Sequence, residues 1–198
     1  MLDPVNASCV EKASLLGDLL LGENKGMAAN GKDGAFWEES GYALMTGVIA
    51  YILSGLEGEE RNLYKLREIL FADDVVYNLA VVLDTMGDKI DKFAHEEISK
   101  FLQTADMTRS GFLVTAQQHL RFLADPAMQK CFSGKNAFDV EAFVAGEPMT
   151  IYLVLPPEKL YAYSRALRVW VGSLMQALFS RRQLPEVPSL FILDEAAQ

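Results

Sequence analysis

The chain has 198 residues, of which 51% are hydrophobic and 23% are charged, a composition typical of a folded protein with a sizeable core. Its formal net charge of −9 argues against a free-standing nucleic-acid binder, because such proteins gather cations into a basic patch that displaces counterions from phosphates. The two cysteines, Cys9 and Cys131, lack the C-x-x-C spacing of a zinc or redox site, and we interpret them as structural thiols.

The first two thirds of the chain show a helical apolar period almost throughout, which predicts an all-helical domain over residues 1–132. The most apolar stretch, residues 41–53, is far shorter than the roughly 20 residues that cross a bilayer, so we expect a buried core helix there. Asp73 and Asp88 are predicted to cap the helices that follow them. The expected helices cover residues 10–21, 36–54, 61–71, 73–86, 88–104 and 108–123.

The pattern changes in the last third, which we assign to a second, partial domain over residues 133–198. Residues 149–155 are β-branched, aromatic and apolar, which is typical of a strand covered on both faces. A helix is expected from the proline pair at 156–157 to about residue 183, and a second strand at 190–193. A mostly α chain that ends in a β-α-β unit with two parallel strands is therefore the predicted fold class.

Asp194 and Glu195 follow the second predicted strand at its carboxyl end, where α/β proteins bind their ligands. In a nucleotide hydrolase, the first acid in such a position holds Mg²⁺ and the second orients the attacking water. The same pattern also occurs where a buried strand simply ends in an acidic turn. The residues alone leave both interpretations open.

Two further motifs are interpreted as surface features. Residues 26–33 match the phosphate-binding loop G-x-x-x-x-G-K, but Asp33 replaces the Ser or Thr hydroxyl that contacts Mg²⁺ and would repel phosphate, so we expect a surface loop. His95 begins a metalloprotease-like H-E pair, but no second histidine follows four residues later. With His119 as the one other histidine in the chain, a solvated helical face is expected instead of a zinc site.

A series of short motifs, taken in order and spacing, resembles the TraG-type coupling proteins of type IV secretion and conjugation. The resemblance covers nearly the whole chain. The motifs are FW at 36–37, RSG at 109–111, FD at 138–139, IYLVLP at 151–156, YSRALR at 163–168 and FILDEAAQ at 191–198.

This resemblance implies a RecA-like P-loop ATPase that forms a homohexamer, is anchored in the bacterial inner membrane and uses ATP with Mg²⁺ on the cytoplasmic face. It implies that relaxase-bound DNA or effector proteins are received and passed to other secretion-system subunits. On the same resemblance, the helical part is the all-α domain, Asp194 is the Mg²⁺-associated acid of the Walker B segment, and Glu195 is the catalytic glutamate.

The chain departs from the family because it has no strand followed by G-x-x-x-x-G-K-[ST], no N-terminal membrane anchor and nothing after Gln198. We therefore expect a fragment that binds no cofactor, because two carboxylates without a phosphate cradle neither bind nor hydrolyse ATP.

Three functional interpretations follow from these observations. The chain is a piece of a translocating motor, or a module that docks the relaxosome or effector proteins, or, as the alternative, a stand-alone helical protein-binding module without an ATPase role. A motor hexamer needs a cation that reaches the neighbouring subunit's phosphate, and the sequence leaves open whether Arg165 or Arg168, three residues apart on the predicted helix, supplies it. Surface salt bridges are the expected role for each, because most helical arginines are solvated or paired.

Overall fold

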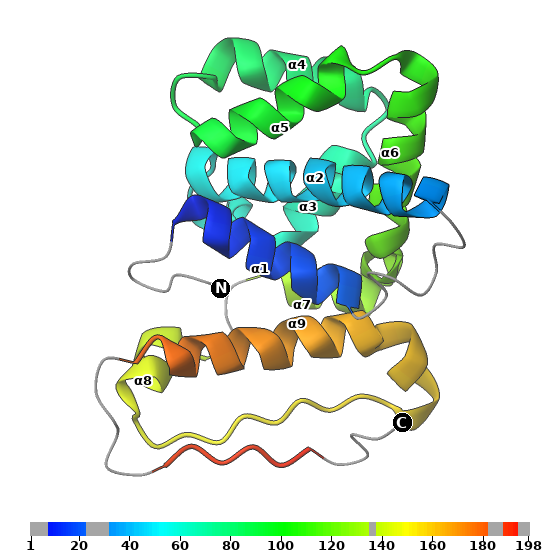
Figure 1. The fold of residues 1–198 in the computed structure, drawn as a ribbon. Helices are drawn as coiled ribbons and strands as arrows, with labels where there is room; N and C mark the ends of the chain where they lie inside the picture. Colours follow the sequence, from blue (N-terminus) through cyan, green and yellow to red (C-terminus); the bar gives the residue numbers. More distant parts are fainter. Residues whose placement is uncertain (1–7, 23–31, 135–137, 182–187, 194–198) are drawn as a thin grey trace.

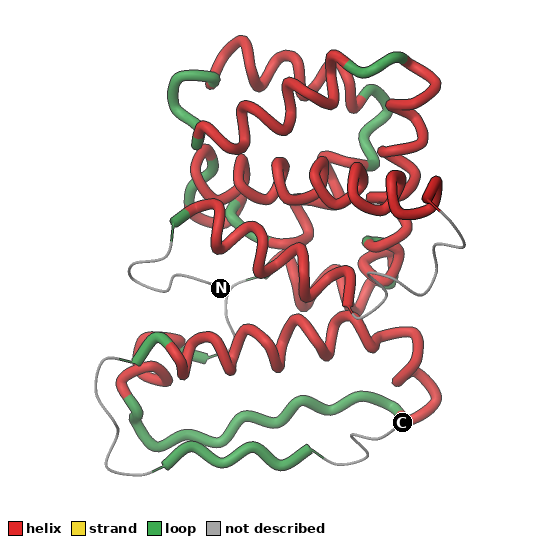
Figure 2. Tube along the Cα trace, in the orientation of Figure 1, coloured by secondary structure: helices red, strands yellow, loops and turns green. Residues whose placement is uncertain are grey.

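The computed structural model describes residues 8–22, 32–134, 138–181 and 188–193, and within these ranges the regular secondary structure is helical (Figure 2). Short 3₁₀ turns lie at Gly58–Glu60, Arg121–Ala124 and Pro157–Lys159. The α-helices are α1 (Cys9–Leu21), α2 (Lys32–Gly55), α3 (Leu63–Leu70), α4 (Val75–Met86), α5 (Lys92–Gln103), α6 (Asp106–His119), α7 (Pro126–Ser133), α8 (Val140–Ala145) and α9 (Leu160–Phe179).

Helix α2 forms the centre of the helical body and packs against α1, α5 and α6 (Figure 1). Its residues Leu44, Met45 and Val48 are almost completely buried, as expected of the most apolar stretch in the sequence. Burial of such side chains is the main stabilising contribution to the body. None of the described helices is long and apolar enough to span a membrane.

The helix starts follow capping chemistry, although two predicted caps were wrong. Helix α1 begins with a capping box in which Ser8 accepts from the Glu11 amide and the Glu11 carboxylate accepts from the Ser8 amide. The cap of α4 is Asp74, one residue after the predicted Asp73, because the buried Val75 directly follows it. The cap of α5 is Asp91 instead of Asp88, because the buried Ile90 belongs to the turn before the helix.

Helix α9 lies along α1 at one side of the helical body, and the extended segments 149–155 and 188–193 lie beyond it (Figure 1). The predicted helix at 156–183 is confirmed for residues 160–179, with a 3₁₀ turn before it. Helices α7 and α8 were not among the expected ranges.

The predicted β-α-β unit is not present in the described residues, because 149–155 and 188–193 are extended but form no strand. The expectation that 149–155 is covered on both faces is also wrong, since Tyr152 and Val154 are 81% and 82% exposed. A parallel pair needs further strands and a cover on both faces before its hydrogen bonds outlast competition from water. The structure therefore shows the helical part of the predicted fold, while the boundary between residues 132 and 133 stays a prediction.

Candidate functional site

The predicted acidic pair lies outside the described residues. Asp194 and Glu195 follow the extended segment 188–193, and their side chains are not part of the description. Most of the loop at 26–33 lies outside it too, up to the start of α2 at Lys32. Among the described residues, no cluster of His, Cys, Asp and Glu gathers in a way that would hold a metal ion.

Arg165 and Arg168, on α9, face the helical body. An N–H of Arg165 donates to the carbonyl oxygen of Gln118 at 3.4 Å, and an N–H of Arg168 donates to the carbonyl oxygen of Leu19 at 3.4 Å. Both acceptors lie in the last turn of a helix, α6 and α1, where unpaired carbonyls and the helix dipole favour a cation.

These contacts change the interpretation of the two arginines. In addition to any salt bridge, both guanidinium groups donate hydrogen bonds to carbonyl oxygens at helix ends. Burial lowers the pKa of Arg165, and the nearby charge of Arg168 lowers it further, yet a guanidinium stays charged at neutral pH. In this arrangement both arginines hold α9 against the helical body.

A buried histidine lies beside this junction. The Nε2 atom of His119 is 3.0 Å from an Oε atom of Glu38, which joins the end of α6 to α2. Burial lowers the pKa of His119, although Glu38 opposes the shift, while the charge of Arg165 adds to it. We therefore assign the pair as a neutral imidazole that donates its Nε2–H to a carboxylate, with a structural role.

Two further contacts set the position of α9. The hydroxyl of Tyr163 donates to Asp125 at 2.6 Å, and Asp125 also caps α7 by accepting from the Ala127 amide. That hydrogen bond from Tyr163 is the main cause of the lowered pKa of Asp125. At the middle of α9, Gly172 lies so close to Leu19 of α1 that any side chain there would overlap it.

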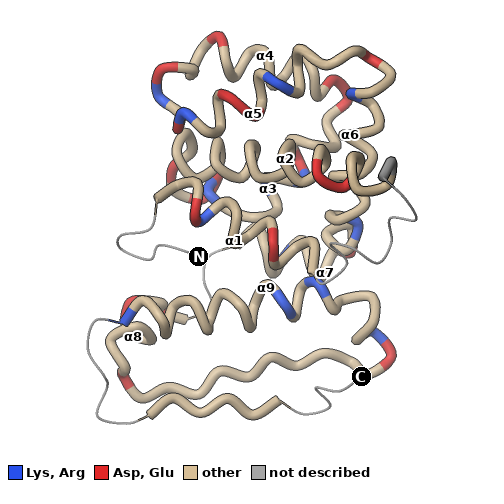
Figure 3. Tube along the Cα trace, in the orientation of Figure 1, with Lys and Arg blue, Asp and Glu red and all other residues tan. Residues whose placement is uncertain are grey.

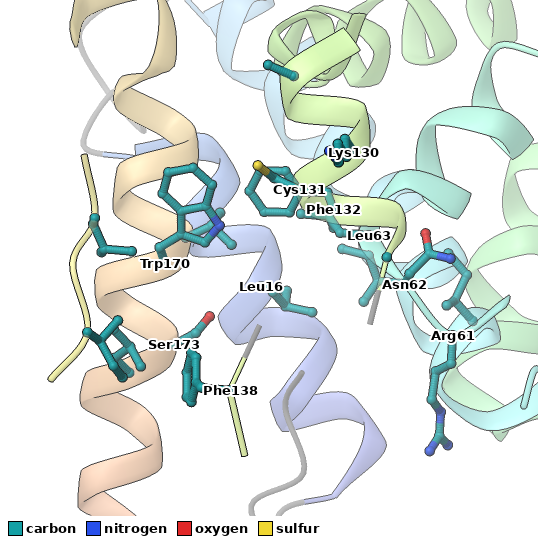
Figure 4. A pocket seen from close by; sticks show the side chains of 18 of the residues that line it. Leu16, Arg61, Asn62, Leu63, Lys130, Cys131, Phe132, Phe138, Trp170 and Ser173 are labelled. Atoms are coloured by element: carbon teal, nitrogen blue, oxygen red, sulfur yellow. The ribbon is translucent and has the colours of Figure 1, made fainter. Parts of the chain in front are cut away.

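A cavity of about 710 Å³ opens between α9, the segment 151–154 and the helical body (Figure 4). Phe132 and Trp170 stack across one part of its wall, with ring centroids 5.4 Å apart and planes 6° from parallel. Ser173 is 96% buried in this wall, and its hydroxyl has no hydrogen-bond partner. Sequence reasoning missed this cavity because its wall combines side chains from residues 16 to 174, and no local motif marks them.

An aromatic cluster forms at the N-terminal end of α2. Phe36, Trp37 and Phe112 meet edge to face, with centroids 5.3 to 5.7 Å apart. A Cβ on Gly111 of α6 would overlap the Trp37 ring, so a larger residue there would force that ring to move. Two of the motifs that carry the resemblance, FW at 36–37 and RSG at 109–111, are thus packed on each other.

The aromatic cluster is partly open to solvent. Phe36 is 49% exposed and Trp37 is 36% exposed. Met107 and Val114 lie on the same face of α6 as Gly111 and are also exposed. We call these four side chains, Phe36, Trp37, Met107 and Val114, the aromatic surface. Exposed apolar side chains that gather in this way are typical of interaction sites.

The two extended segments form a second apolar surface. Residues 149–155 and 188–193 carry no charged side chain, in contrast to the helical body (Figure 3). Tyr152 and Val154 of the first segment and Leu190 and Ile192 of the second are strongly exposed. Side chains of this kind are normally buried by further layers of a fold.

Comparison with known proteins gives consistent matches. A family model described as "Type IV secretory system Conjugative DNA transfer" matches residues 7–198. The chain is 26% identical over 181 residues to the type IV secretion system-coupling protein VirD4 of Bartonella henselae, covering 89% of this chain and 27% of the relative. It is 28% identical over 165 residues to the conjugal transfer protein TraG of Rhizobium radiobacter, covering 82% and 25%.

A further VirD4 relative, from Bartonella quintana, is 26% identical over 201 residues, which covers 98% of this chain and 30% of the relative. The chain therefore spans between a quarter and a third of the length of the curated relatives it matches. No solved structure gives a significant match.

Proposed function

Because the chain belongs to the family of type IV secretory system conjugative DNA transfer proteins, we propose that it is the cargo-docking part of a coupling protein. In this role it recruits relaxase-bound DNA, through the relaxosome, or effector proteins for delivery to other secretion-system subunits. The observation that carries the proposal is the family match over residues 7–198, together with relatives named as coupling and conjugal transfer proteins.

We place cargo docking on the aromatic surface. Phe36 and Trp37 pack edge to face against Phe112, and Trp37 also lies against Gly111, so we expect them to present apolar area with little loss of side-chain entropy on binding. Rigid aromatic anchors of this kind contribute most of the energy in protein interfaces. The net charge of −9 supports a protein, in preference to DNA, as the partner that the aromatic surface contacts.

The C-terminal part is proposed to belong to the motor. In a longer, homohexameric parent at the cytoplasmic face of the inner membrane, Asp194 would hold the Mg²⁺ of bound ATP and Glu195 would orient the attacking water. The open apolar faces of 149–155 and 188–193 support this proposal, because strands and helices of a RecA-like domain would cover them. ATP and Mg²⁺ are cofactors of that parent in this proposal.

The second candidate is a stand-alone helical protein-binding module without an ATPase role. The observation that favours it is the continuous hydrophobic core around α2, to which α1 to α7 and the buried face of α9 contribute. Under both candidates the aromatic surface binds a protein. They differ in whether Asp194 and Glu195 matter for transfer.

The docking proposal is tested by measuring binding of the purified 198-residue chain to a purified relaxase from the same conjugative element, by biolayer interferometry. We expect saturable binding that Phe36→Ser weakens strongly. The substitution should leave the fold intact, because the Phe36 side chain is half exposed and contributes little to the core. Phe179→Ser is the matched control, because Phe179 is 73% exposed on α9. Absence of binding, or equal loss in both variants with unchanged thermal unfolding, would contradict the assignment.

A further inference from the structure

We propose that the position of α9 controls the aromatic surface through a contact of three side chains, Glu38, His119 and Arg165, and that a proton on the imidazole loosens this contact. The inference rests on the proposed function in one respect, because cargo docking is the activity that is controlled. The contact itself, and its effect on Trp37 of the aromatic surface, do not depend on which cargo binds.

The three side chains bring three helices together. Glu38 belongs to α2, His119 is the last residue of α6, and Arg165 belongs to α9. The Nε2 atom of His119 lies 3.0 Å from an Oε atom of Glu38. An N–H of Arg165 donates to the carbonyl oxygen of Gln118, the residue before the histidine, at 3.4 Å. A displacement of α9 therefore acts first on the end of α6.

Close packing joins the end of α6 to the aromatic surface. Trp37 directly precedes Glu38 in α2, and its ring lies against Gly111 of α6, where a Cβ would overlap it. One turn further along α2, a Cβ on Gly41 would come within 2.8 Å of Thr115 of α6. Protein interiors packed to this density have low compressibility and transmit displacement. A shift at the end of α6 therefore reaches the Trp37 ring.

The buried imidazole of His119 is sensitive to a proton. The residue is 6% exposed, and its Nδ1 atom is buried without a hydrogen-bond partner. Because the Nε2–H is assigned as the donor to Glu38, a second proton would lie on Nδ1, where the structure offers no acceptor. A buried donor without an acceptor costs free energy, so the end of α6 must move to give the imidazolium a partner or water.

The charges around His119 link its protonation to α9. Burial lowers the pKa of His119, the carboxylate of Glu38 from α2 opposes the shift, and the charge of Arg165 from α9 adds to it. Arg168 and Tyr161, also on α9, act in turn on Arg165. With Arg165 in place the imidazole stays neutral, and with Arg165 withdrawn it takes a proton more readily. Since linkage is reciprocal, protonation also weakens the hold of α9 on the helical body.

The test uses the 198-residue chain with Trp170→Phe, so that Trp37 is the remaining tryptophan and reports from the aromatic surface. Acrylamide quenching of Trp37 is measured between about pH 8 and 5, and proton NMR follows the imidazole resonances over the same range. We expect the quenching to change with the midpoint of the His119 titration. His119→Gln should abolish the change, because glutamine keeps a donor for Glu38 but has no group that titrates. His95→Gln is the matched control, since it replaces an exposed histidine of α5, and should leave the change intact.

Arginine variants test the part that α9 plays. Arg165→Gln should raise the pKa of His119 toward its ordinary value and alter the quenching of Trp37 at neutral pH, whereas Arg165→Lys should preserve that pKa because the charge remains. Arg61→Gln is the matched control and should change neither quantity. Arg61 also donates to a helix carbonyl, that of Leu53, but at the C-terminal end of α2, away from the aromatic surface.

Relaxase binding then connects this contact to docking. We expect Arg165→Gln to weaken binding of the purified relaxase about fivefold or more, and Arg61→Gln to leave it unchanged. Thermal unfolding followed by circular dichroism establishes that each variant is folded. If Arg165→Gln does not fold, the pH titration of Trp37 with His119→Gln still decides the proposal.

Three results would overturn the proposal. One is Trp37 quenching that does not depend on pH, and another is a pH dependence that survives in the folded His119→Gln variant. The third is a folded Arg165→Gln variant in which Trp37 and His119 behave as in the native chain, or in which Arg61→Gln has the same effects. If the relaxase does not bind the native chain, the docking proposal fails, whereas the measurements on Trp37 and His119 still decide whether α9 controls this surface.

Discussion

The packing of α9 on α1 allows the cost of a substitution at Gly22 to be predicted. Gly22 ends α1 with a φ of 73° and a ψ of −165°. This conformation is essentially restricted to glycine, so Gly22→Ala carries backbone strain of about 1–3 kcal/mol. A Cβ at this position would also overlap the guanidinium of Arg168 and displace it from the Leu19 carbonyl. Loss of that hydrogen bond costs about 1 kcal/mol.

We therefore expect Gly22→Ala to lower the free energy of unfolding by about 2–4 kcal/mol in the native background. In an Arg168→Ala background the overlap is absent, and the same change should cost about 1 kcal/mol less. Urea unfolding followed by circular dichroism at 222 nm measures both values. A neutral Gly22→Ala, or strictly additive effects of the two substitutions, would refute the described packing of α9 on α1.

Three other predictions are independent of that junction. His119 has a lowered pKa in the folded protein, so its contribution to stability is complete above about pH 6.5 and is lost as pH falls toward the folded value, by at most about 1.4 kcal/mol per pH unit. His119→Gln should flatten the fall in urea stability between pH 6.5 and 5.5, and an unchanged slope would show that the imidazole is not buried. Met45→Ala should cost about 2–5 kcal/mol, because Met45 is fully buried in α2, and a loss below 1 kcal/mol would contradict the central place of that helix. In the longer parent, Glu195→Gln should leave ATP and Mg²⁺ binding intact and stop hydrolysis in a phosphate-release assay. Normal turnover would mean that the acidic pair has no catalytic role.

Helices α1 to α6 and α9 were predictable because each carries its own apolar period, whereas the short helices α7 and α8 were missed. The apolar period of α1 and α2 requires no knowledge of distant residues, and the two predicted ranges fall inside the observed ones. The capping residues were harder to predict, because several acidic residues precede α4 and α5. Which of them caps the helix depends on which neighbouring residue is buried, and tertiary packing decides that. A strand is different again, because its hydrogen bonds are made to other strands. An apolar run such as 149–155 therefore indicates a propensity for strand but does not say which strands would pair with it.

The functional surfaces were only partly visible in the sequence. FW at 36–37 and RSG at 109–111 were recognised as motifs, but their contact through Gly111 depends on how α2 and α6 cross. The same holds for Arg165 and Arg168, because the helical period does not say which face of α9 meets the body. The cavity and the unpaired Ser173 hydroxyl arise from the packing of segments far apart in the chain, so no spacing of residues in the sequence predicts them.

The central claim, that this chain docks cargo for a type IV secretion coupling protein, is tested most directly by conjugative transfer. Phe36→Ser, Glu195→Gln and the control Phe179→Ser would be introduced into the encoding gene in its own host, and transfer to recipients would be counted per donor. We predict that Phe36→Ser and Glu195→Gln reduce transfer to the level of a strain that lacks the gene, with normal protein abundance, while Phe179→Ser transfers normally. Unchanged transfer in the Phe36→Ser strain would contradict the claim.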